Sequence, residues 1–252
     1  MSDKIQFFAL LFLAEVSGLT AVVLIGLFGG QFNREPGYRW DGSLNTFNYH
    51  PLLMIVGFIF LQGNGENIPF GAITYRVMVA TGIQLPRPVV KLIHGGIQAF
   101  AFMLATVALV ATFKYHKTQG WADMYHPHSW VGITAFSLYG LQLIIGFTFL
   151  LFPKFGSDAL RSRVALIHVS SGRFMFIMLV ATALMGMSEA SIYDVVHSEQ
   201  LPPAIIVSNT FCLCLLLFAA TIVTILWNPN YGTKNQTEDC IELMESSHPL
   251  NA

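Results

Sequence analysis

Long apolar stretches, each bounded by polar residues, organise the sequence and predict six membrane-spanning helices. A helix needs about 20 residues to cross the bilayer core, and all but one of the stretches come near that length. Because the membrane interior offers no water to backbone groups, such stretches are expected to be helical. They cover residues 7–30, 51–62, 92–113, 130–152, 164–187 and 204–227.

The second stretch is the exception, because it is short and polar residues follow it directly. The polar run at residues 64–69 separates it from an apolar continuation that ends near Val79. This run contains Glu66, and a carboxylate at bilayer depth is costly. It also contains Pro69, which removes a backbone donor and restricts the residue before it. We therefore expect irregular backbone over residues 64–71.

Composition supports a membrane protein and excludes several other classes. Of 252 residues, 54% are hydrophobic and only 11% are charged, whereas soluble domains carry roughly 25% charged residues. The net charge is −1 and no run of lysine or arginine occurs, so we expect no nucleic-acid partner. Cys212, Cys214 and Cys240 form neither a disulfide framework nor a zinc-binding spacing.

The distribution of lysine and arginine predicts that both termini lie in the cytosol. Cytosolic loops carry the excess of these cations. The side with the termini holds eight of them, which are Lys4, Arg76, Arg87, Lys91, Lys154, Arg161, Arg163 and Lys234. The opposite side holds four, which are Arg34, Arg39, Lys114 and Lys117.

The chain divides into a membrane domain, residues 1–227, and a polar cytosolic tail, residues 228–252. The tail is acidic and poor in apolar residues, a composition typical of disorder. No basic segment precedes the first apolar stretch and no small-residue cleavage site follows it. We therefore expect this stretch to remain as a span and not to be removed as a signal peptide.

Four of the eight histidines stand where four successive apolar stretches begin. Adjacent spans run in opposite directions, so these histidines are expected to alternate between the two membrane faces. His50 and His128 are expected at the non-cytosolic side. His94 and His168 are expected at the cytosolic side. The sequence therefore predicts two facing pairs, one near each surface.

An imidazole pair on facing helices can ligate a heme iron from both sides. Ionisable groups within spans are rare and tend to be functional, so the pattern predicts a helical bundle with two hemes. A metal transporter or a proton relay would use the same histidines, and the pattern alone leaves that alternative open. Covalent c-type heme is excluded, because no Cys-x-x-Cys-His motif occurs.

The residues around these histidines resemble the cytochrome b561 family. The similarity extends from about Gly18 to Trp227 and is greatest to the animal, ascorbate-reactive members. It is carried by Trp40–Gly42, Phe47–Leu52, Lys91–His94, Ala122–Tyr125, His128–Gly132, Leu160–Arg163 with His168, and Ala181–Gly186.

The resemblance implies an all-α integral membrane protein of six helices, whose second to fifth helices bind two non-covalent heme b groups. His50 and His128 would ligate the iron on the non-cytosolic side, and His94 and His168 the iron on the cytosolic side. The family is an ascorbate-dependent transmembrane oxidoreductase that transfers electrons to monodehydroascorbate or ferric ion. The resemblance also implies a homodimer in membrane lipid, to which the glycine pair Gly26 and Gly30 could contribute.

Ascorbate is a monoanion at neutral pH, so its cytosolic site is expected to be cationic and next to a heme. Cations stand three and seven residues before His94, and five and seven before His168. Spacings of three and seven keep roughly one helical face, if the helix extends that far. The expected ascorbate site is Arg76, Arg87, Lys91, Arg161 and Arg163, which would also serve as membrane anchors or propionate partners.

On the non-cytosolic side, the expected substrate-binding residues are His116 and Tyr125. A histidine near its usual pKa can carry a proton there, although a solvated loop histidine has no such role. His126 stands where the family has a small polar residue. Residues 64–71 look like an insertion, which shifts Arg76 relative to the family pattern.

Arg173, five residues after His168, stands where the family pattern has an apolar side chain. It would pair with a heme propionate, raise the heme potential, or extend to the interface as a snorkelling arginine. A heme-bearing subunit without a substrate of its own is a third interpretation of the chain. The sequence selects neither the acceptor nor a vesicle, lysosomal or plasma membrane.

Overall fold

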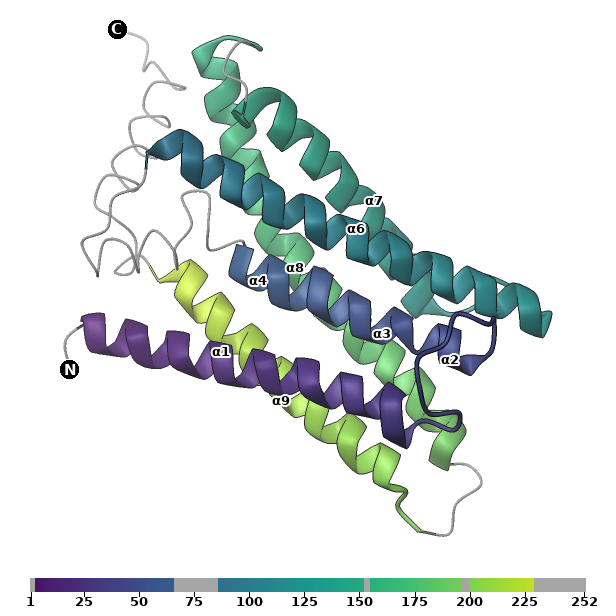
Figure 1. The fold of residues 1–252 in the computed structure, drawn as a ribbon. Coiled ribbons are helices and arrows are strands. Elements are labelled where there is room, and N and C mark those ends of the chain that lie inside the picture. Colours follow the sequence, from purple (N-terminus) through teal and green to yellow (C-terminus); the bar gives the residue numbers. More distant parts are fainter. Residues whose placement is uncertain (1–2, 66–85, 152–154, 196–199, 229–252) are drawn as a thin grey trace, which may run out of the picture.

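A computed structural model describes residues 3–65, 86–151, 155–195 and 200–228, and the regular elements in these ranges are all helical. Six helices among them are long and apolar enough to cross a membrane, which confirms the predicted all-α, six-span architecture (Figure 1). The spans are Ile5–Phe32, Leu44–Asn64, Pro88–Gln119, Pro127–Leu151, Asp158–Ser191 and Pro203–Trp227. Arg76, most of the segment 64–71 and the tail from residue 229 onward lie outside the described residues.

The first and last spans pack against each other along their lengths. α1 (Asp3–Leu27) continues into the π-helical η1 (Phe28–Phe32), and α9 (Pro203–Trp227) lies beside it. The start of α1 and the end of α9 lie at the same end of the bundle (Figure 1). Close packing depends on Gly18, where an added Cβ would lie 2.8 Å from the ring of Phe218.

The second span consists of four short helical segments. They are α2 (Leu44–Phe47), α3 (Tyr49–Met54), the π-helical η2 (Ile55–Leu61) and α4 (Gln62–Gly65). The irregular geometry therefore begins before residue 64, at η2. There Gly57 lies against α6, and a Cβ on it would be 2.9 Å from the backbone oxygen of Ala101.

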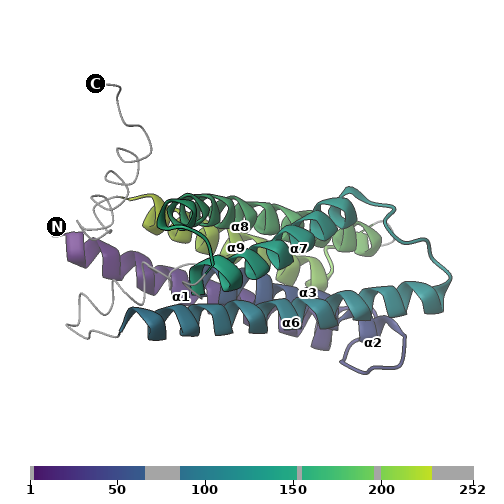
Figure 2. The ribbon, with the colours of Figure 1, turned by 90° about the horizontal axis from the view of Figure 1, so that it is seen from above.

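Three long helices carry His94, His128 and His168, while His50 lies in the second span. They are α6 (Arg87–Gln119), α7 (Pro127–Ile145), which continues into η3 (Gly146–Leu151), and α8 (Asp158–Val195). Both α6 and α7 have a proline in the first turn, where a missing N–H costs nothing. α6 and α8 begin well before their apolar stretches, so the cations that precede His94 and His168 lie on the same helices as these histidines. Figure 2 shows that the helices lie with their axes roughly along one line, although successive spans alternate in chain direction.

The loop before the second span is fixed by Asn48, whose side chain is fully buried. Its amide Nδ2 lies 2.8–3.0 Å from the backbone oxygens of Gly29, Glu35 and Gly37, which share its two N–H hydrogens. Its Oδ1 accepts from Asn33 Nδ2 at 2.6 Å. Asn48 thus joins the end of the first span to the start of the second, two residues before His50.

Asn48→Ala is expected to destabilise the protein by about 3 kcal/mol or more, because several buried backbone oxygens lose their donor at once. The measurement is the thermal inactivation midpoint in detergent. Asn33→Ala is the matched control, since it removes only one of these hydrogen bonds. Equal midpoints for the two variants would contradict the role of Asn48 in joining the first span to the second.

Tyr38 ties the same loop to the first span. Its hydroxyl donates to the backbone oxygen of Gly26 at 2.8 Å, and its ring packs edge-on against Tyr49. Burial, together with the neighbouring Tyr49, raises the pKa of Tyr38 to about 12. The hydroxyl therefore stays protonated and keeps donating over the physiological pH range.

A layer of aromatic rings fills the middle of the bundle. Phe58 stacks on Tyr139 with ring centroids 4.5 Å apart, and Phe102 stacks on Phe136 at 4.7 Å. Phe58 follows His50 by eight residues, and Phe102 follows His94 by eight. At 1.5 Å per residue, this places the rings about 12 Å along each helix from its histidine, in the apolar region between the two histidine pairs.

Candidate functional site

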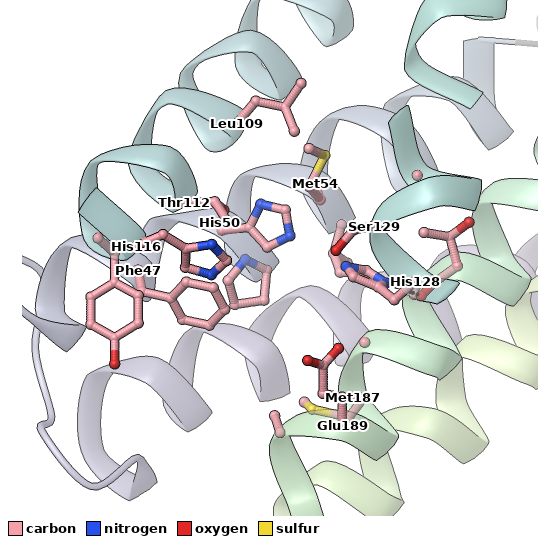
Figure 3. A pocket seen from close by; sticks show the side chains of 18 of the residues that line it. Phe47, His50, Met54, Leu109, Thr112, His116, His128, Ser129, Met187 and Glu189 are labelled. Atoms are coloured by element: carbon pink, nitrogen blue, oxygen red, sulfur yellow. Dashed lines mark hydrogen bonds between the residues drawn. The ribbon is translucent and has the colours of Figure 1, made fainter. Parts of the chain in front are cut away.

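The structure brings the four histidines together in the two pairs that the sequence predicts. The rings of His50 on α3 and His128 on α7 have centroids 6.0 Å apart and are nearly perpendicular, at 89°. The rings of His94 on α6 and His168 on α8 have centroids 6.4 Å apart, at 74°. Figure 3 shows the His50 and His128 rings pointing toward one another across a cavity.

Both ring spacings fit a metal ion held between two imidazoles. An imidazole–metal bond of about 2 Å, added to a nitrogen-to-centre distance of about 1.1 Å on each side, gives centroids about 6.2 Å apart. The observed separations of 6.0 Å and 6.4 Å lie on either side of this value. Each pair could therefore hold a metal ion, and a heme iron is one that takes two histidines.

Backbone carbonyls orient His50 and His128, the pair predicted for the non-cytosolic side and called the outer pair below. His50 Nδ1 lies 3.3 Å from the oxygen of Ala108, and His128 Nδ1 lies 2.8 Å from the oxygen of Thr182. A carbonyl oxygen only accepts, so each Nδ1 carries the proton and each Nε2 keeps a free lone pair. This is the usual outer-shell arrangement of a metal-ligating histidine.

Two glycines leave room for the ligand rings. A Cβ on Gly186 of α8 would lie 2.6 Å from Cε1 of His128, and a Cβ on Gly146 at the start of η3 would lie 2.9 Å from Cε1 of His168. Both separations are too short for real contacts. Each histidine ring therefore occupies space that any larger residue at the glycine would fill.

The outer pair faces a largely apolar cavity of about 210 Å³. Its apolar walls include Met54, Ile55, Phe58, Leu109 and Leu179, and its polar rim includes Arg34, His116, Asp123, Tyr125 and Glu189. The apolar walls can cover the edge of a macrocycle, and the polar side chains can contact a polar molecule. Both residues expected for the non-cytosolic substrate, His116 and Tyr125, therefore line the same cavity as His50 and His128.

Two histidine–carboxylate pairs lie close to Tyr125, and all of their members except His126 line the cavity. His116 Nδ1 lies 2.9 Å from Asp123 Oδ1, and His126 Nδ1 lies 3.1 Å from Glu189 Oε2. The Tyr125 hydroxyl donates to Glu189 Oε1 at 2.7 Å. Neither Asp123 nor Glu189 was predicted as a site residue from the sequence. The one available signal was that acidic residues are rare this close to a span.

The cations predicted to bind ascorbate that the structure describes lie at the start of the two helices that carry His94 and His168. Lys91, one turn before His94, donates through Nζ to the oxygen of Leu150 at 3.1 Å, which links α6 to η3. Arg161 pairs with Asp158 in the first turn of α8, and Arg163 is exposed. Arg87 is the first residue of α6, but its side chain, like all of Arg76, lies outside the described residues.

Arg173 faces away from His168. Five residues correspond to about 140° around a helix, so Arg173 and His168 lie on different faces of α8. The guanidinium lies over the indole of Trp227 on α9, 5.3 Å from its centroid. This contact favours the snorkelling arginine of the sequence analysis over a partner for the heme, because Trp227 ends the last span and tryptophan favours the membrane interface.

Comparisons with known proteins agree with the site. The sequence model of the family described as eukaryotic cytochrome b561 matches residues 49–194, which include all four paired histidines. A transmembrane ascorbate-dependent reductase (CYB561) of Mus musculus is 37% identical over 227 residues, covering 90% of this chain and 85% of the relative. The protein of that name in Homo sapiens is 36% identical over 227 residues, with coverage of 90% and 85%. A plasma membrane ascorbate-dependent reductase (CYBRD1) of Xenopus laevis is 36% identical over 235 residues, with coverage of 90% and 79%.

Proposed function

This chain belongs to the eukaryotic cytochrome b561 family, and on that premise we propose that it transfers electrons from cytosolic ascorbate across the membrane to an acceptor on the opposite side. The observation that carries the proposal is the presence of two facing histidine pairs at opposite ends of one bundle. The names of the relatives, transmembrane and plasma membrane ascorbate-dependent reductases, supply the electron donor.

Two non-covalent heme b groups are the cofactors of this proposal. His50 and His128 would hold one, and His94 and His168 the other. When bound, b-type heme supplies an iron that accepts and releases one electron at a time. The carbonyls of Ala108 and Thr182 keep the outer ligand rings in the tautomer that can bind iron.

The donor site is proposed at the cytosolic ends of α6 and α8. Ascorbate is an anion, and the cations that precede His94 and His168 supply the charge to bind it. The expected set remains Arg76, Arg87, Lys91, Arg161 and Arg163. Lys91 has the most direct support. Its Nζ donates to Leu150 in η3, and the first residue of η3, Gly146, lies against the ring of His168.

Lys91→Ala and Arg161→Ala are each expected to raise the KM for ascorbate roughly three- to tenfold, since each removes a cation from an anion site. Reduction of the protein by dithionite, which needs no such site, should be unchanged. Lys114→Ala is the matched control, because Lys114 lies on the outer side, where it donates to the oxygen of Trp40. An unchanged ascorbate KM in both variants would rule out this location.

The acceptor site is proposed at the rim of the outer cavity, where His116 and Tyr125 would contact either monodehydroascorbate or a ferric chelate. Both side chains lie in the polar rim, so an acceptor bound between them is close to His50 and His128. The matched test is reoxidation of the ascorbate-reduced protein by each acceptor in a stopped-flow instrument, with His116→Ala and Tyr125→Phe compared with the wild type.

The proposed topology places both termini in the cytosol, and the polar tail of residues 228–252 with them. Exposed apolar side chains such as Ile167 and Leu213 would contact membrane lipid. Gly26 and Gly30 face Leu52 and Tyr38 of the same chain. The homodimer that we propose therefore rests on family membership and not on these glycines.

Heme content and ascorbate oxidation test the whole proposal. The purified protein should carry about two hemes per chain, consistent with two bis-histidine sites. In vesicles loaded with ascorbate, it should reduce a ferric chelate or ferricyanide on the other side. A histidine-lined metal or proton transporter, the alternative from the sequence, would show no Soret absorbance. A heme protein that ascorbate fails to reduce would leave only the interaction-subunit interpretation.

A further inference from the structure

Glu189 lies at the end of the bundle that holds His50 and His128, and the proposed function gives it no role. Its side chain is only 19% exposed. Both carboxylate oxygens have a partner from the segment that leads into α7. Oε1 accepts from the hydroxyl of Tyr125 at 2.7 Å, and Oε2 lies 3.1 Å from Nδ1 of His126.

Glu189 also continues a row of contacts between α8 and the outer ligand His128. The oxygen of Thr182 accepts from His128 Nδ1, and Gly186 leaves room for the His128 ring. Residues 182, 186 and 189 follow a spacing of four and three, which is one face of a helix. Three successive turns of α8 thus hold the start of α7, and Glu189 is the outermost contact.

The segment that Glu189 holds is folded tightly. Met124 has a φ of +60°, which is uncommon for a residue other than glycine and carries strain. The oxygen of Met124 accepts from Trp130 Nε1 at 2.8 Å, which folds the segment back onto the first turn of α7. His126 is the residue directly before α7, so its contact with Glu189 lies at the start of that helix. A strained segment keeps such a conformation only where its surroundings determine it.

We propose that Glu189 is a positioning residue of the outer site, with two separable roles that rest on the proposed function. Through His126, it fixes the start of α7 and hence the orientation of His128. Through Tyr125, it fixes a side wall of the cavity rim and hence the fit of the acceptor. His126 completes the contact in this chain at a position where the family resemblance shows a small polar residue.

Four variants of the full-length protein separate the two roles. Glu189→Gln keeps an oxygen for the Tyr125 hydroxyl but removes the charge that faces His126. His126→Ser removes the same contact from the other side. Tyr125→Phe removes only the hydroxyl, and Glu189→Ala removes both contacts. Glu35→Gln is the control, because it also removes one carboxylate from the outer side and Glu35 is exposed.

Two readouts are needed, one for each role. The first is the low-spin ferric EPR signal and midpoint potential of the outer heme, assigned by comparison with His50→Ala. The second is the KM for the outer acceptor, measured alongside the KM for ascorbate. The first readout needs neither substrate, so it tests Glu189 even if the donor or acceptor of the proposed function is wrong.

We expect Glu189→Gln and His126→Ser to change the EPR signal and potential of the outer heme in the same way, and their double variant to add little further change. Tyr125→Phe should leave that signal unchanged and raise the acceptor KM severalfold. Glu189→Ala should do both, with an acceptor KM roughly tenfold higher, as for the loss of a hydrogen bond to a charged group. The ascorbate KM should stay constant throughout.

Unchanged spectra and potential in both Glu189→Gln and His126→Ser would overturn the role through His126. An unchanged acceptor KM in Tyr125→Phe and Glu189→Ala would overturn the role through Tyr125. If Glu189→Ala fails to fold, the other three variants still decide both points. Equal effects of Glu35→Gln would show that general surface charge, and not positioning, is responsible.

Discussion

His50→Ala is expected to remove one heme from the purified protein and to leave the other, and His94→Ala is expected to do the converse. Each substitution would remove one of the two histidines proposed to hold a non-covalent heme, so the remaining histidine would hold it weakly. Because the two pairs lie at opposite ends of the bundle and share no residue, the heme-to-protein ratio should fall by roughly half in either variant.

The two variants should differ in which reaction is lost. His94→Ala should abolish rapid reduction by cytosolic ascorbate, because the site next to Lys91 and Arg161 is then missing. His50→Ala should still be reduced by ascorbate but should pass electrons to the outer acceptor far more slowly. Pyridine hemochrome assays and stopped-flow absorbance measure the two effects.

His116→Ala is the matched histidine control. His116 lies near the outer pair and is 8% exposed, but it pairs with Asp123 and not with another imidazole. It should keep both hemes. Full heme content in both His50→Ala and His128→Ala, or complete loss of heme in His50→Ala alone with the protein still folded, would contradict two independent sites.

The pairing of the histidines could be predicted from the sequence because it depends on few physical facts. Apolar stretches of membrane length fix the spans, and successive spans must alternate in direction. A histidine at the start of each of four spans then alternates between the two faces, and the ring distances show that His50 meets His128 and His94 meets His168. Helix packing supplied the remaining condition, that the paired helices face each other across the bundle.

The lengths of the helices were less predictable, since hydropathy marks the membrane and not the helix. α8 begins at Asp158, well before the apolar stretch that starts at residue 164. Polar residues next to a span can form either a further turn of helix in water or a loop, and hydropathy does not distinguish the two. The π-helical turns of η2 were also not predicted. They lie at Ile55–Leu61, where the sequence is uniformly apolar and carries no sign of a change in winding.

The polar contacts at the outer rim could not be found from the sequence at all. Glu189 lies 63 residues after His126 in the chain, and neither residue is part of a periodic pattern. Their contact follows from the crossing of α7 and α8, which one sequence does not specify. The choice between the interpretations of Arg173 could not be made from the sequence for the same reason, because its partner Trp227 belongs to a helix far along the chain.

Gly186→Val is expected to remove the outer heme as completely as the loss of a ligand, although Gly186 contributes no ligand atom. Even the Cβ of a larger residue would lie 2.6 Å from Cε1 and 2.9 Å from Nδ1 of His128. The ring cannot yield without cost, because Nδ1 also donates to the oxygen of Thr182, one turn earlier on the same helix. Valine must therefore displace the ring from its position opposite His50 or push α8 away from α7.

Two other glycines serve as comparisons for Gly186. Gly132→Ala places a Cβ at 3.4 Å from Cγ2 of Thr182, an ordinary contact, and should retain both hemes. Gly146→Val crowds His168 instead, with a Cβ at 2.9 Å from Cε1, and should remove the cytosolic heme selectively. The heme-to-protein ratio of each variant, with assignment of the remaining heme by EPR, decides the matter. Retention of the outer heme in Gly186→Val would mean that the His128 ring is free to move, and its bond to Thr182 would then be too weak to set its orientation.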